Sequence, residues 1–541
     1  MKYLKLFTLV FVSLLMAMKS IAQETSKDWV FSSGGQWSDQ ANAIVTDSQG
    51  NIYATGSFQG KMNIKSKTLK SDGDTDIFIA KFNESGELLW AKRAGGKVRK
   101  RNTITEFGSD LVLVDDKYLY VTGAFSLIAN FENENIESNG QDDVFIAKYT
   151  TDGKLEWVRS AGGSSQDIVY ALDADHYGNI YLTGSFQKNA NFGSFVLESS
   201  NLTEMFVAKL TSYGKFEWVK QSSSNSMSAG KSLKCINDYC IIGGEYKGGM
   251  KLLNTEISSK GEGDLFFTKL DLEGNLVWLN TLGGRGSEKL GDIDIKKDQI
   301  YFVGNSNESF QELPQMIDKD AILGSLSIDG NLNWLKSFGG TGNDLGKTLA
   351  ITENEEIIIS GIFEKNLSID VYELISTKHQ SAFLVSMNSR GDVNWGENLG
   401  GSSQHQVNDI GLYNGNVFMT GFMRGKIDLF GEQINSVGSS DMFFLKLNSI
   451  YEEKDIVISD MIHVYPNPSE GLFTLQSDPS LEAEDVRIEI FDMQGVLLFS
   501  KTYENDLSKD YRVDVSKISS GLYLLEASFD GKSYSKRIII K

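Results

Sequence analysis

The sequence predicts an all-β protein in which a set of strands repeats seven times, with a smaller β domain at the C-terminal end. Seven of the eight tryptophans recur at intervals of 56 to 67 residues. Glycine is abundant, at 53 residues, and proline is rare, at 4, which suits tight turns between strands better than disordered linkers. Internal repetition at a period of this length decides the fold before any single element does.

Length and charge limit the classes of function. The chain has 541 residues, enough for one large repeat domain and a smaller one. Lys and Arg number 52 against 72 Asp and Glu, so the net charge is −20. This acidic balance argues against nucleic acid or an anionic membrane as the main partner.

The N-terminal residues predict export. Lys2 and Lys5 precede an apolar run over residues 6–18, and the small residues Ser20 and Ala22 predict signal peptide cleavage before Gln23. The signal peptide is thus residues 1–22. The alternative, a membrane anchor, needs a longer apolar run, and no later segment approaches the roughly 18 apolar residues of a spanning helix. We expect a secreted or cell-surface protein without a membrane span.

Cys235 and Cys240 are the two cysteines of the chain. They flank a short turn between two strand-like runs, where Cβ atoms across a hairpin come within disulfide reach. A local disulfide is plausible in an oxidising compartment, and two buried free thiols are the alternative. A metal site is disfavoured because no histidine lies nearby.

One tryptophan context recurs along most of the chain. Six tryptophans follow the pattern Gly-x-apolar-x-Trp, as in Gly86-Glu-Leu-Leu-Trp90, and Gly-Gly follows most of them, as at Gly95-Gly96. The pattern predicts a turn that leads into a strand carrying the tryptophan. The recurring residues are Trp29, Trp90, Trp157, Trp218, Trp278, Trp334 and Trp395.

Other strands repeat with the same period. One strand ends in Thr-Gly or an equivalent pair, as at Thr183-Gly184, and another reads Asp76-Ile-Phe-Ile-Ala-Lys. Turns such as Asp175-His-Tyr-Gly-Asn179 separate the strands. Each period therefore holds four short strands, which is the content of one propeller blade.

The order of the strands predicts how the ring closes. The seventh set, at about residues 402–447, has no tryptophan strand after it, whereas the chain starts with a single tryptophan strand at Lys27-Asp-Trp29. We expect this N-terminal strand to complete the seventh blade, because closure removes an exposed sheet edge. The prediction is a closed seven-bladed β-propeller over residues 27–448, in preference to a linear array with uncapped ends.

These units resemble the SBBP family of bacterial seven-bladed propeller repeats, especially over residues 175–186 (Asp-His-Tyr-Gly-Asn-Ile-Tyr-Leu-Thr-Gly-Ser-Phe). The resemblance covers roughly residues 27–448. It implies the fold and leaves the activity open, because propellers carry many activities.

A second domain is predicted after a linker at residues 449–459. Three of the four prolines lie beyond residue 460, where the repeat stops. Six or seven strand-like runs over residues 460–541, joined by hairpin turns such as Asp492-Met-Gln-Gly495, fit a small Ig-like β-sandwich.

This tail is similar to the type A C-terminal sorting domain of the type IX secretion system. The matching residues are Tyr465-Pro-Asn-Pro468 with Gly471, Ile490-Phe-Asp-Met-Gln-Gly495, Ser520-Gly-Leu-Tyr523 and Lys536-Arg-Ile-Ile-Ile-Lys541. The resemblance implies that the type IX machinery of a Bacteroidetes-type bacterium is a partner. The tail would then be removed, and the protein released or fixed to the surface. An ordinary sandwich that binds another partner is the alternative.

The residues do not predict catalysis. The four histidines show no metal-ligand spacing, and no Gly-x-Ser-x-Gly motif is present. Gly153-Lys-Leu-Glu-Trp157 resembles quinoprotein repeats, but without visible cofactor ligands. Acidic pairs such as Asp72 with Asp74 and Asp142 with Asp143 could bind Ca²⁺ or act in glycoside hydrolysis, although solvated loop residues are the commoner case. No cofactor is predicted, apart from possible Ca²⁺.

We expect a ligand to bind at the loops that join successive blades, because loops on a rigid scaffold converge around the centre of such a ring. Trp37 is the one tryptophan outside the repeat, and an exposed aromatic beside polar groups suits a sugar or peptide. Basic residues of an insert could hold a carboxylate or phosphate. The candidates are Trp37, Arg99, Lys100, Arg101, Gln166, Asp167, Arg285, Glu288, Asn343, Asp344 and His405.

The function expected from the sequence is that of a non-catalytic binding or adhesion propeller, with a glycan or a surface protein as ligand. A propeller-fold carbohydrate-active enzyme, either a lyase or a hydrolase, is the alternative from another class. A structural envelope component without a ligand pocket is the third possibility.

Overall fold

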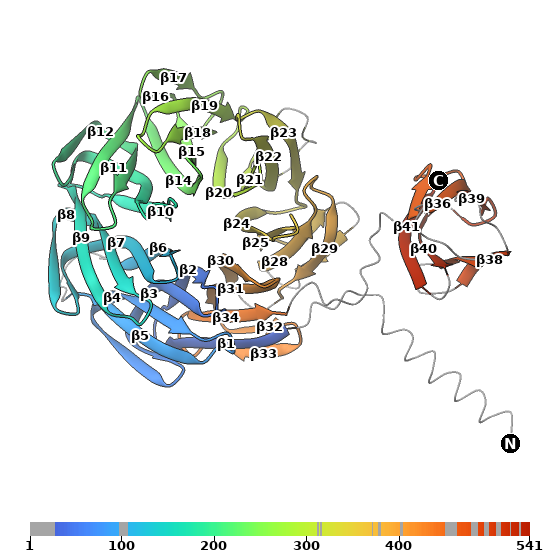
Figure 1. Cartoon of the computed structure of the whole chain (residues 1–541), viewed down its shortest axis with the longest axis horizontal. Coiled ribbons are helices and arrows are strands. Elements are labelled where there is room, and N and C mark those ends of the chain that lie inside the picture. Colours follow the sequence, from blue (N-terminus) through green and yellow to red (C-terminus); the bar gives the residue numbers. More distant parts are fainter. Residues whose placement is uncertain are drawn as a thin grey trace. The chain divides into compact units, whose positions relative to one another are not determined.

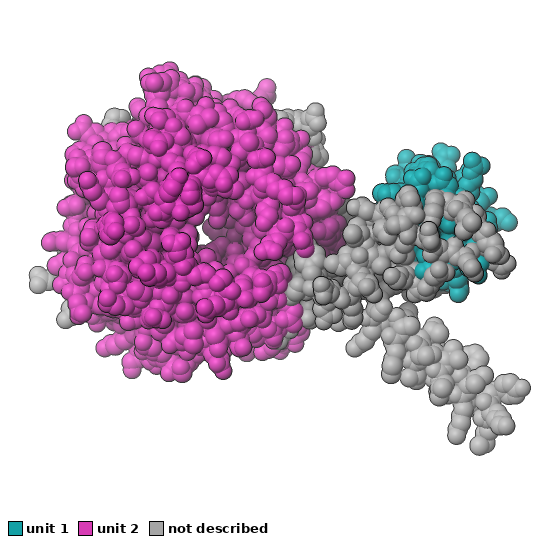
Figure 2. All heavy atoms as spheres, in the orientation of Figure 1, with its two compact units in different colours: residues 1–24, 451–541 teal, residues 25–450 magenta. Residues whose placement is uncertain are grey.

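A computed structural model of the chain describes residues 27–541 apart from several short segments. Outside the description lie residues 1–26, 97–105, 311, 312, 314, 315, 317, 370–371, 377–379, 401–403, 449–461, 478–484, 492–496, 505–509, 520 and 530–531. The predicted signal peptide with its cleavage site at Ala22 and Gln23 and the predicted linker fall there. Two compact units are present, one spanning Thr25–Ile450 and one whose described part lies within Tyr451–Lys541 (Figure 2).

The larger unit consists of antiparallel strands that pair in chain order. In one example, β6 (Phe107–Val114), β7 (Tyr118–Phe131), β8 (Glu134–Thr150) and β9 (Leu155–Gly163) pair as successive neighbours. We name such a set a blade after its first strand and label its strands A to D. The blades stand around a central opening with the A strands innermost, so the fold is propeller-like (Figure 1).

The other blades repeat this order. The β2 blade holds β2 (Gln40–Thr46), β3 (Ile52–Ile64), β4 (Lys67–Phe82) and β5 (Leu88–Gly95). The β10 blade holds β10 (Ile168–Ala174), β11 (Ile180–Phe192), β12 (Phe195–Leu210) and β13 (Phe216–Ser224). The β14 blade holds β14 (Met227–Ile236), β15 (Tyr239–Lys247), β18 (Asp264–Asp271) and β19 (Leu276–Leu282).

Three further sets follow along the chain. The β20 blade holds β20 (Glu288–Lys296), β21 (Gln299–Ser306), β22 (Asp320–Ser327) and β23 (Leu332–Phe338). The β24 blade holds β24 (Leu345–Ile351), β25 (Ile357–Phe363), β28 (Ser381–Met387) and β29 (Val393–Asn398). The β30 blade holds β30 (His405–Tyr413), β31 (Asn416–Met423) and β34 (Asp441–Leu447).

The outer strand of the β30 blade comes from the opposite end of the chain. β1 (Lys27–Gly35) pairs antiparallel with β34, and Val30 lies opposite Leu445. The last residues of β1 also pair with β3, where Gly34 lies opposite Asn63. The tryptophan strand at the start of the chain therefore lies beside the last strand of the unit.

Several B and C strands are longer than the short strands that the sequence predicts, because they continue beyond the blade as a two-stranded ribbon. The ribbon pairs with the end of the preceding D strand, as Ala94 does with Phe131. In three blades the ribbon is a separate hairpin: β16 (Gly249–Leu252) with β17 (Thr255–Ser258), β26 (Asn366–Ile369) with β27 (Tyr372–Ile375), and β32 (Lys426–Leu429) with β33 (Glu432–Asn435). In the β20 blade, none of the described residues between β21 and β22 forms a ribbon.

The core lies between blades, and the recurring tryptophans join one blade to the next. The indole N–H of Trp90 donates to the carbonyl oxygen of Thr151, 3.1 Å away in the C–D turn of the next blade. Gly153 in the same turn has φ +84°, and a Cβ there would lie 2.9 Å from the Trp90 ring. We call this arrangement a tryptophan lock. It recurs at Trp29, Trp157, Trp218, Trp278 and Trp334.

The smaller unit contains two sheets around one core. One sheet has the order β35 (Ile462–Tyr465), β36 (Leu472–Ser477), β39 (Asp510–Asp514). The other has the order β38 (Leu497–Glu504), β37 (Asp485–Phe491), β40 (Gly521–Phe529), β41 (Lys532–Ile540). Buried residues from both sheets, such as Phe473 and Ile488, form one hydrophobic cluster.

Candidate functional site

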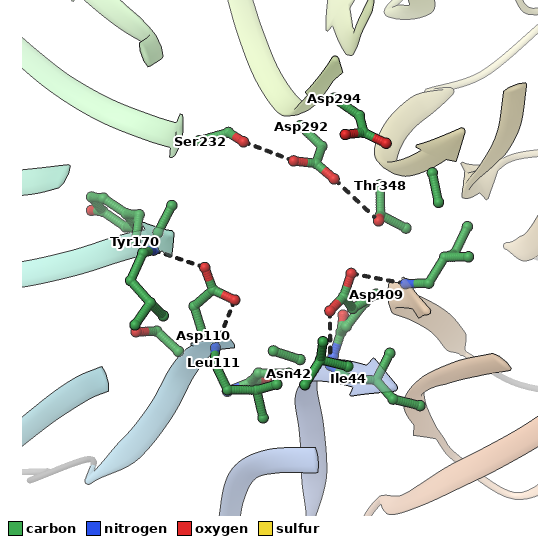
Figure 3. A pocket seen from close by; sticks show the side chains of 18 of the residues that line it. Asn42, Ile44, Asp110, Leu111, Tyr170, Ser232, Asp292, Asp294, Thr348 and Asp409 are labelled. Carbon is green, nitrogen blue, oxygen red and sulfur yellow. Dashed lines mark hydrogen bonds between the residues drawn. The ribbon is translucent and has the colours of Figure 1, made fainter. Parts of the chain in front are cut away.

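A central cavity of about 920 Å³ is surrounded by the A strands of the blades (Figures 1 and 3). Each A strand carries one extra residue, because the register with its B strand shifts there, as between Gly108 and Asp110. Such a β-bulge redirects side chains, and here it places polar groups toward the cavity. The extra residues are Asn42, Ser109, Tyr170, Lys231, Gly291, Lys347 and Asn408.

Aspartates that line this cavity tie neighbouring blades together (Figure 3). Asp409 accepts the N–H of Ile410 in its own strand and that of Ile44 in the β2 blade, both at 2.8 Å. Asp110 does the same with Leu111 at 2.8 Å and Leu172 at 2.9 Å. Asp173, Asp292 and Asp294 repeat this double acceptance. The carboxylates therefore serve the packing of the A strands.

The cavity shifts the protonation of these groups. Burial raises the pKa of Asp110 to about 8 and that of Asp409 to about 7, although backbone N–H groups oppose the shift. Burial alone would lower the pKa of Lys234, but Asp294 and other aspartates around it outweigh burial and raise the pKa. Lys234 thus stays charged and neutralises part of the acidic lining.

The cavity aspartates and Lys234 are not among the residues that the sequence predicts for a site. The hydrogen bond between Asp110 and Leu172 joins residues 62 positions apart, so no local motif shows it. A signal was nevertheless present, because aspartate recurs within inner strands that are otherwise apolar. Aligning the repeats position by position would have revealed these residues.

No arrangement suited to metal chemistry is found in the described part of the chain. No group of three or more His, Cys, Asp and Glu side chains could hold a metal ion among the described residues. The acidic pairs considered for Ca²⁺ are engaged otherwise: Asp72 forms an ion pair with Arg93 at 2.8 Å, and Asp142 accepts the side-chain N–H of Gln166 at 2.9 Å.

Four of the predicted site residues are buried at the start of A strands. Asp167, Glu288 and Asp344 each accept the N–H of the second glycine of a Gly-Gly pair, at 2.7, 3.1 and 2.8 Å. His405 accepts the N–H of Ala382 through Nε2 at 3.1 Å. These contacts give the four side chains a role in shaping the loop.

The remaining predicted residues lie on separate parts of the loops. Trp37 is 49% exposed and packs on Gly60, where a Cβ would lie 2.8 Å from its ring. Asn343 donates to Glu364 at 3.3 Å. No hydrogen bond or ion pair joins any two of the predicted residues within the described ranges, and Arg99, Lys100 and Arg101 lie outside them.

Cys235 and Cys240 form a disulfide across β14 and β15.

A cleft of about 570 Å³ opens between the β14 and β20 blades, where none of the described residues between β21 and β22 forms a ribbon. Elsewhere the ribbon lies directly on the second glycine of the Gly-Gly pair. A Cβ on Gly163 would lie 1.7 Å from the carbonyl oxygen of Asn189, and the residue that approaches the equivalent Gly284 is Phe310. The cleft is lined by Gly283, Gly284, Phe310, Ser309, Glu308 and the cations Lys260 and Arg285.

The charge of the cleft differs from that of the whole chain. Lys260 donates to the carbonyl oxygen of Gly283 at 3.5 Å, and Arg285 is exposed, with no hydrogen bond or ion pair of its guanidinium to a described residue. Glu308 is the acidic residue of the lining. The lining holds two cations and one carboxylate, and because Lys260 also faces the buried Asp264, Arg285 is the cation that lies open at the cleft of this acidic chain.

Residues 463–541 match the family of secretion system C-terminal sorting domains. The match indicates that the protein is exported by the type IX secretion system and is located outside the cell or on its surface. Among the described residues, no helix is both long enough and apolar enough to cross a membrane.

Two curated proteins are similar to this chain. An uncharacterised WD repeat-containing protein of Acanthamoeba polyphaga mimivirus is 20% identical over 468 residues, covering 76% of this chain and 32% of that protein. The regulatory protein FlaEY of Caulobacter vibrioides is 22% identical over 391 residues, covering 66% of this chain and 40% of that protein. The chain thus spans between 32% and 40% of the length of these relatives.

Among solved structures, the sialidase of Trypanosoma rangeli in complex with the inhibitor DANA aligns with a TM-score of 0.36 and 9% identity. The alignment covers 79% of this chain and 83% of the sialidase.

Proposed function

We propose that this exported chain is a non-catalytic binding protein in which a closed seven-bladed propeller of SBBP-type repeats presents a ligand site. The β1–β34 pairing and the recurring strand order support the closed ring. The two small sheets support an Ig-like sandwich as the sorting domain. The ligand is an anionic group of a glycan or of a surface protein, and it binds in the cleft between the β14 and β20 blades.

The observation that carries this proposal is the break in the repeat at the β20 blade, where no described residue between β21 and β22 forms a ribbon and a cleft opens beside Arg285. A repeat protein that keeps one pattern elsewhere and breaks it at one position commonly does so at a functional site. At this position Phe310 lies against Gly284 in place of ribbon backbone, and Arg285 is exposed at the edge of the opening. A binding site requires such an opening, whereas a purely structural ring would be better packed without it.

The chemistry of the lining selects the class of ligand. A guanidinium presents several N–H donors that match a carboxylate or sulfate, and Lys260 adds a second positive charge. An acidic polysaccharide and an acidic segment of a surface protein both carry such groups. The cavity aspartates do not compete as a catalytic pair, because each already accepts backbone N–H groups from two blades.

The test is a thermal-shift titration of residues 23–541, called the mature chain below, with oligogalacturonate. The methyl ester of the same oligosaccharide is the neutral control. A ligand at about 100 times its Kd should add roughly 2.7 kcal/mol to the stability of the folded state. Arg285→Ala should weaken binding by about 10- to 100-fold, because charged hydrogen bonds contribute about 1.5–3 kcal/mol. Arg390→Ala, at an exposed C–D turn, removes the same charge elsewhere and should leave binding unchanged.

Other results would redirect the assignment. Equal shifts with the acid and its ester, or an Arg285→Ala variant that binds normally, would place the ligand elsewhere, and Trp37→Ala would then be tested. Binding of an acidic peptide without any saccharide would favour a surface protein as ligand. Production of new saccharide ends would support the enzyme alternative, and the absence of any ligand would support a structural envelope component.

A further inference from the structure

Two buried carboxyl groups meet at several junctions between blades. One group belongs to a C strand, and the other lies at or directly before the first residue of the next A strand. Asp143 and Asp167 form one such pair, and both are 0% exposed. Two equivalent pairs are Asp76 with Glu106 and Asp264 with Glu288, and in a third pair Asp344 is buried beside the half-buried Asp320, whose Oδ1 atom is buried.

The first glycine of the Gly-Gly motif shows how closely these groups approach. A Cβ on Gly283 would lie 2.6 Å from Oε2 of Glu288 and 2.6 Å from Cγ of Asp264. A Cβ on Gly95 would lie 2.3 Å from Oε2 of Glu106 and 3.0 Å from Oδ1 of Asp76. Both carboxyl groups therefore reach one spot, where only the hydrogen of a glycine fits.

Positive charge compensates these pairs incompletely. Arg93 lies 3.1 Å from Asp76, and Lys260 faces Asp264. The other titratable group that faces Asp143 and Asp167 is Asp142, whose negative charge adds repulsion. Two ionised carboxylates buried side by side without a cation are strongly disfavoured.

The hydrogen bonds at Asp143 and Asp167 leave one oxygen of each carboxyl group without a well-aligned donor among the described residues. Oδ2 of Asp143 accepts the N–H of Asn139 at 2.9 Å, and Oδ2 of Asp167 accepts the N–H of Gly163 at 2.7 Å. The Oδ1 atoms of both residues are buried and meet no well-aligned donor among the described residues, although the backbone N–H of Gln187 lowers the pKa of Asp167. Oδ1 of Asp76, Asp264 and Asp320 is in the same state. A protonated carboxyl group is a donor, so one proton between two carboxyl groups supplies a bond that two carboxylates cannot make.

We propose that each of these four carboxyl pairs holds one proton in the folded ring, so that the blade junctions loosen when alkaline pH removes it. One carboxyl group of each pair keeps its O–H and donates it to the other, which remains a carboxylate. On unfolding at neutral pH the proton is released to solvent.

The protonation equilibria agree with this arrangement. Burial, followed by the neighbouring carboxylate, raises the pKa of Glu106 to about 9, and burial is the largest cause that raises the pKa of Asp167 to about 8. The same groups lose their protons near pH 4 in the unfolded chain. The folded state therefore binds more protons between these limits, and its stability decreases as pH rises toward the folded-state pKa values.

The test compares the pH dependence of unfolding for the mature chain and for Asp167→Asn, whose amide N–H₂ is a permanent donor toward Asp143. For each proton held by the folded state, the unfolding equilibrium constant should rise tenfold per pH unit between about pH 5 and 7. Asp167→Asn should lose one such tenfold factor. Glu134→Gln removes the same charge at an exposed ribbon turn and should keep the full slope.

Three results would overturn the proposal. The first is an equal slope for the mature chain and Asp167→Asn. The second is the absence of proton release when the mature chain unfolds in weakly buffered solution at pH 6.5, a measurement that needs no variant to fold. The third is stabilisation of the mature chain by Ca²⁺ that a chelator reverses and Asp167→Asn abolishes, because the pair would then hold a cation.

Discussion

Trp334 and Trp395 occupy the same place in successive repeats but differ in what they reach. Trp334 donates to the carbonyl oxygen of Ser389 at 3.2 Å, and a Cβ on Gly391 would lie 3.0 Å from its ring. Trp395 is 8% exposed, and its indole N–H has no acceptor in the described structure. The difference follows from the path of the chain, because no C–D turn connects β34 to its outer neighbour β1.

The comparison shows that a tryptophan lock needs a continuous C–D turn. Where the turn is present, one short segment supplies both the carbonyl acceptor and the glycine against the ring. In the β30 blade no C–D turn is possible, because the outer strand β1 comes from before the first blade. There the pairing of β1 with β34 joins the outer strand to the blade. We call the region of β1, β34 and Trp395 the seam. Three predictions test this comparison.

Removal of β1 should have the largest effect, because the seam has no other outer strand. Deleting residues 23–35 removes Val30, together with Trp29 and Phe31, which pack on the neighbouring core. Loss of large apolar side chains costs about 3–5 kcal/mol each, so we expect a loss of more than about 5 kcal/mol and an exposed β34 edge. Calorimetry and gel filtration measure the two effects.

The control for this deletion removes residues 23–26 and leaves β1 in place. It should unfold like the mature chain. If the longer deletion unfolds at the same temperature as this control, strand pairing at the seam does not hold the ring together.

Removing single indole N–H groups should have smaller effects on the free energy of unfolding, and the two tryptophans should differ in the size of the loss. Trp90→Phe loses the hydrogen bond to Thr151 and should destabilise the folded state by about 1–2 kcal/mol beyond the loss of ring area. Trp395→Phe removes a buried donor that has no acceptor among the described residues, and it should destabilise the folded state by about 1 kcal/mol less than Trp90→Phe. Urea denaturation of both variants measures the difference. Equal losses would mean that Trp395 has an acceptor after all.

The smallest expected effect is the difference in stability between two glycine-to-alanine variants. It distinguishes backbone strain from packing against the tryptophan ring in the tryptophan lock. Gly153 has φ +84° and faces the Trp90 ring, whereas Gly431 has φ +80° with nothing within 4 Å of a Cβ. Gly431→Ala should cost about 1 kcal/mol for the backbone alone, and Gly153→Ala about 1 kcal/mol more for the overlap with the ring. Melting temperatures of the two variants give the difference. If both fall equally, the glycine serves the turn and not the tryptophan.

Strand order and turn positions could be predicted from the sequence because their signals are local. A turn glycine such as Gly153 and the following Trp157 lie four residues apart and report one turn and one strand. The long ribbons were not predicted, since the same alternation continues beyond the blade without a mark at its edge. Asp167, Glu288 and Asp344 were chosen as polar loop residues, but their burial depends on a Gly-Gly pair and a ribbon from elsewhere in the chain.

The cleft beside Arg285 lay beyond sequence reasoning for a related reason. No local pattern distinguishes the segment between β21 and β22, whose described residues form no ribbon. The glycines that this segment faces belong to the preceding blade, so the cleft exists only when the two blades are packed together.

The pairing of β1 with β34 also sets the timing of assembly. Ser32 and Asn435, which touch at the seam, are 403 residues apart in the chain. The other blades are built from strands that follow one another along the chain, whereas β1 and its partner β34 are separated by all the other strands of the larger unit. Long-range contacts of this kind form slowly, because the entropy of closing a long loop is lost before the new contacts stabilise the structure. We therefore expect the pairing of β1 with β34 to be the slow step in folding of the larger unit. Until it occurs, the backbone N–H and C=O groups along that edge of β1 remain unpaired.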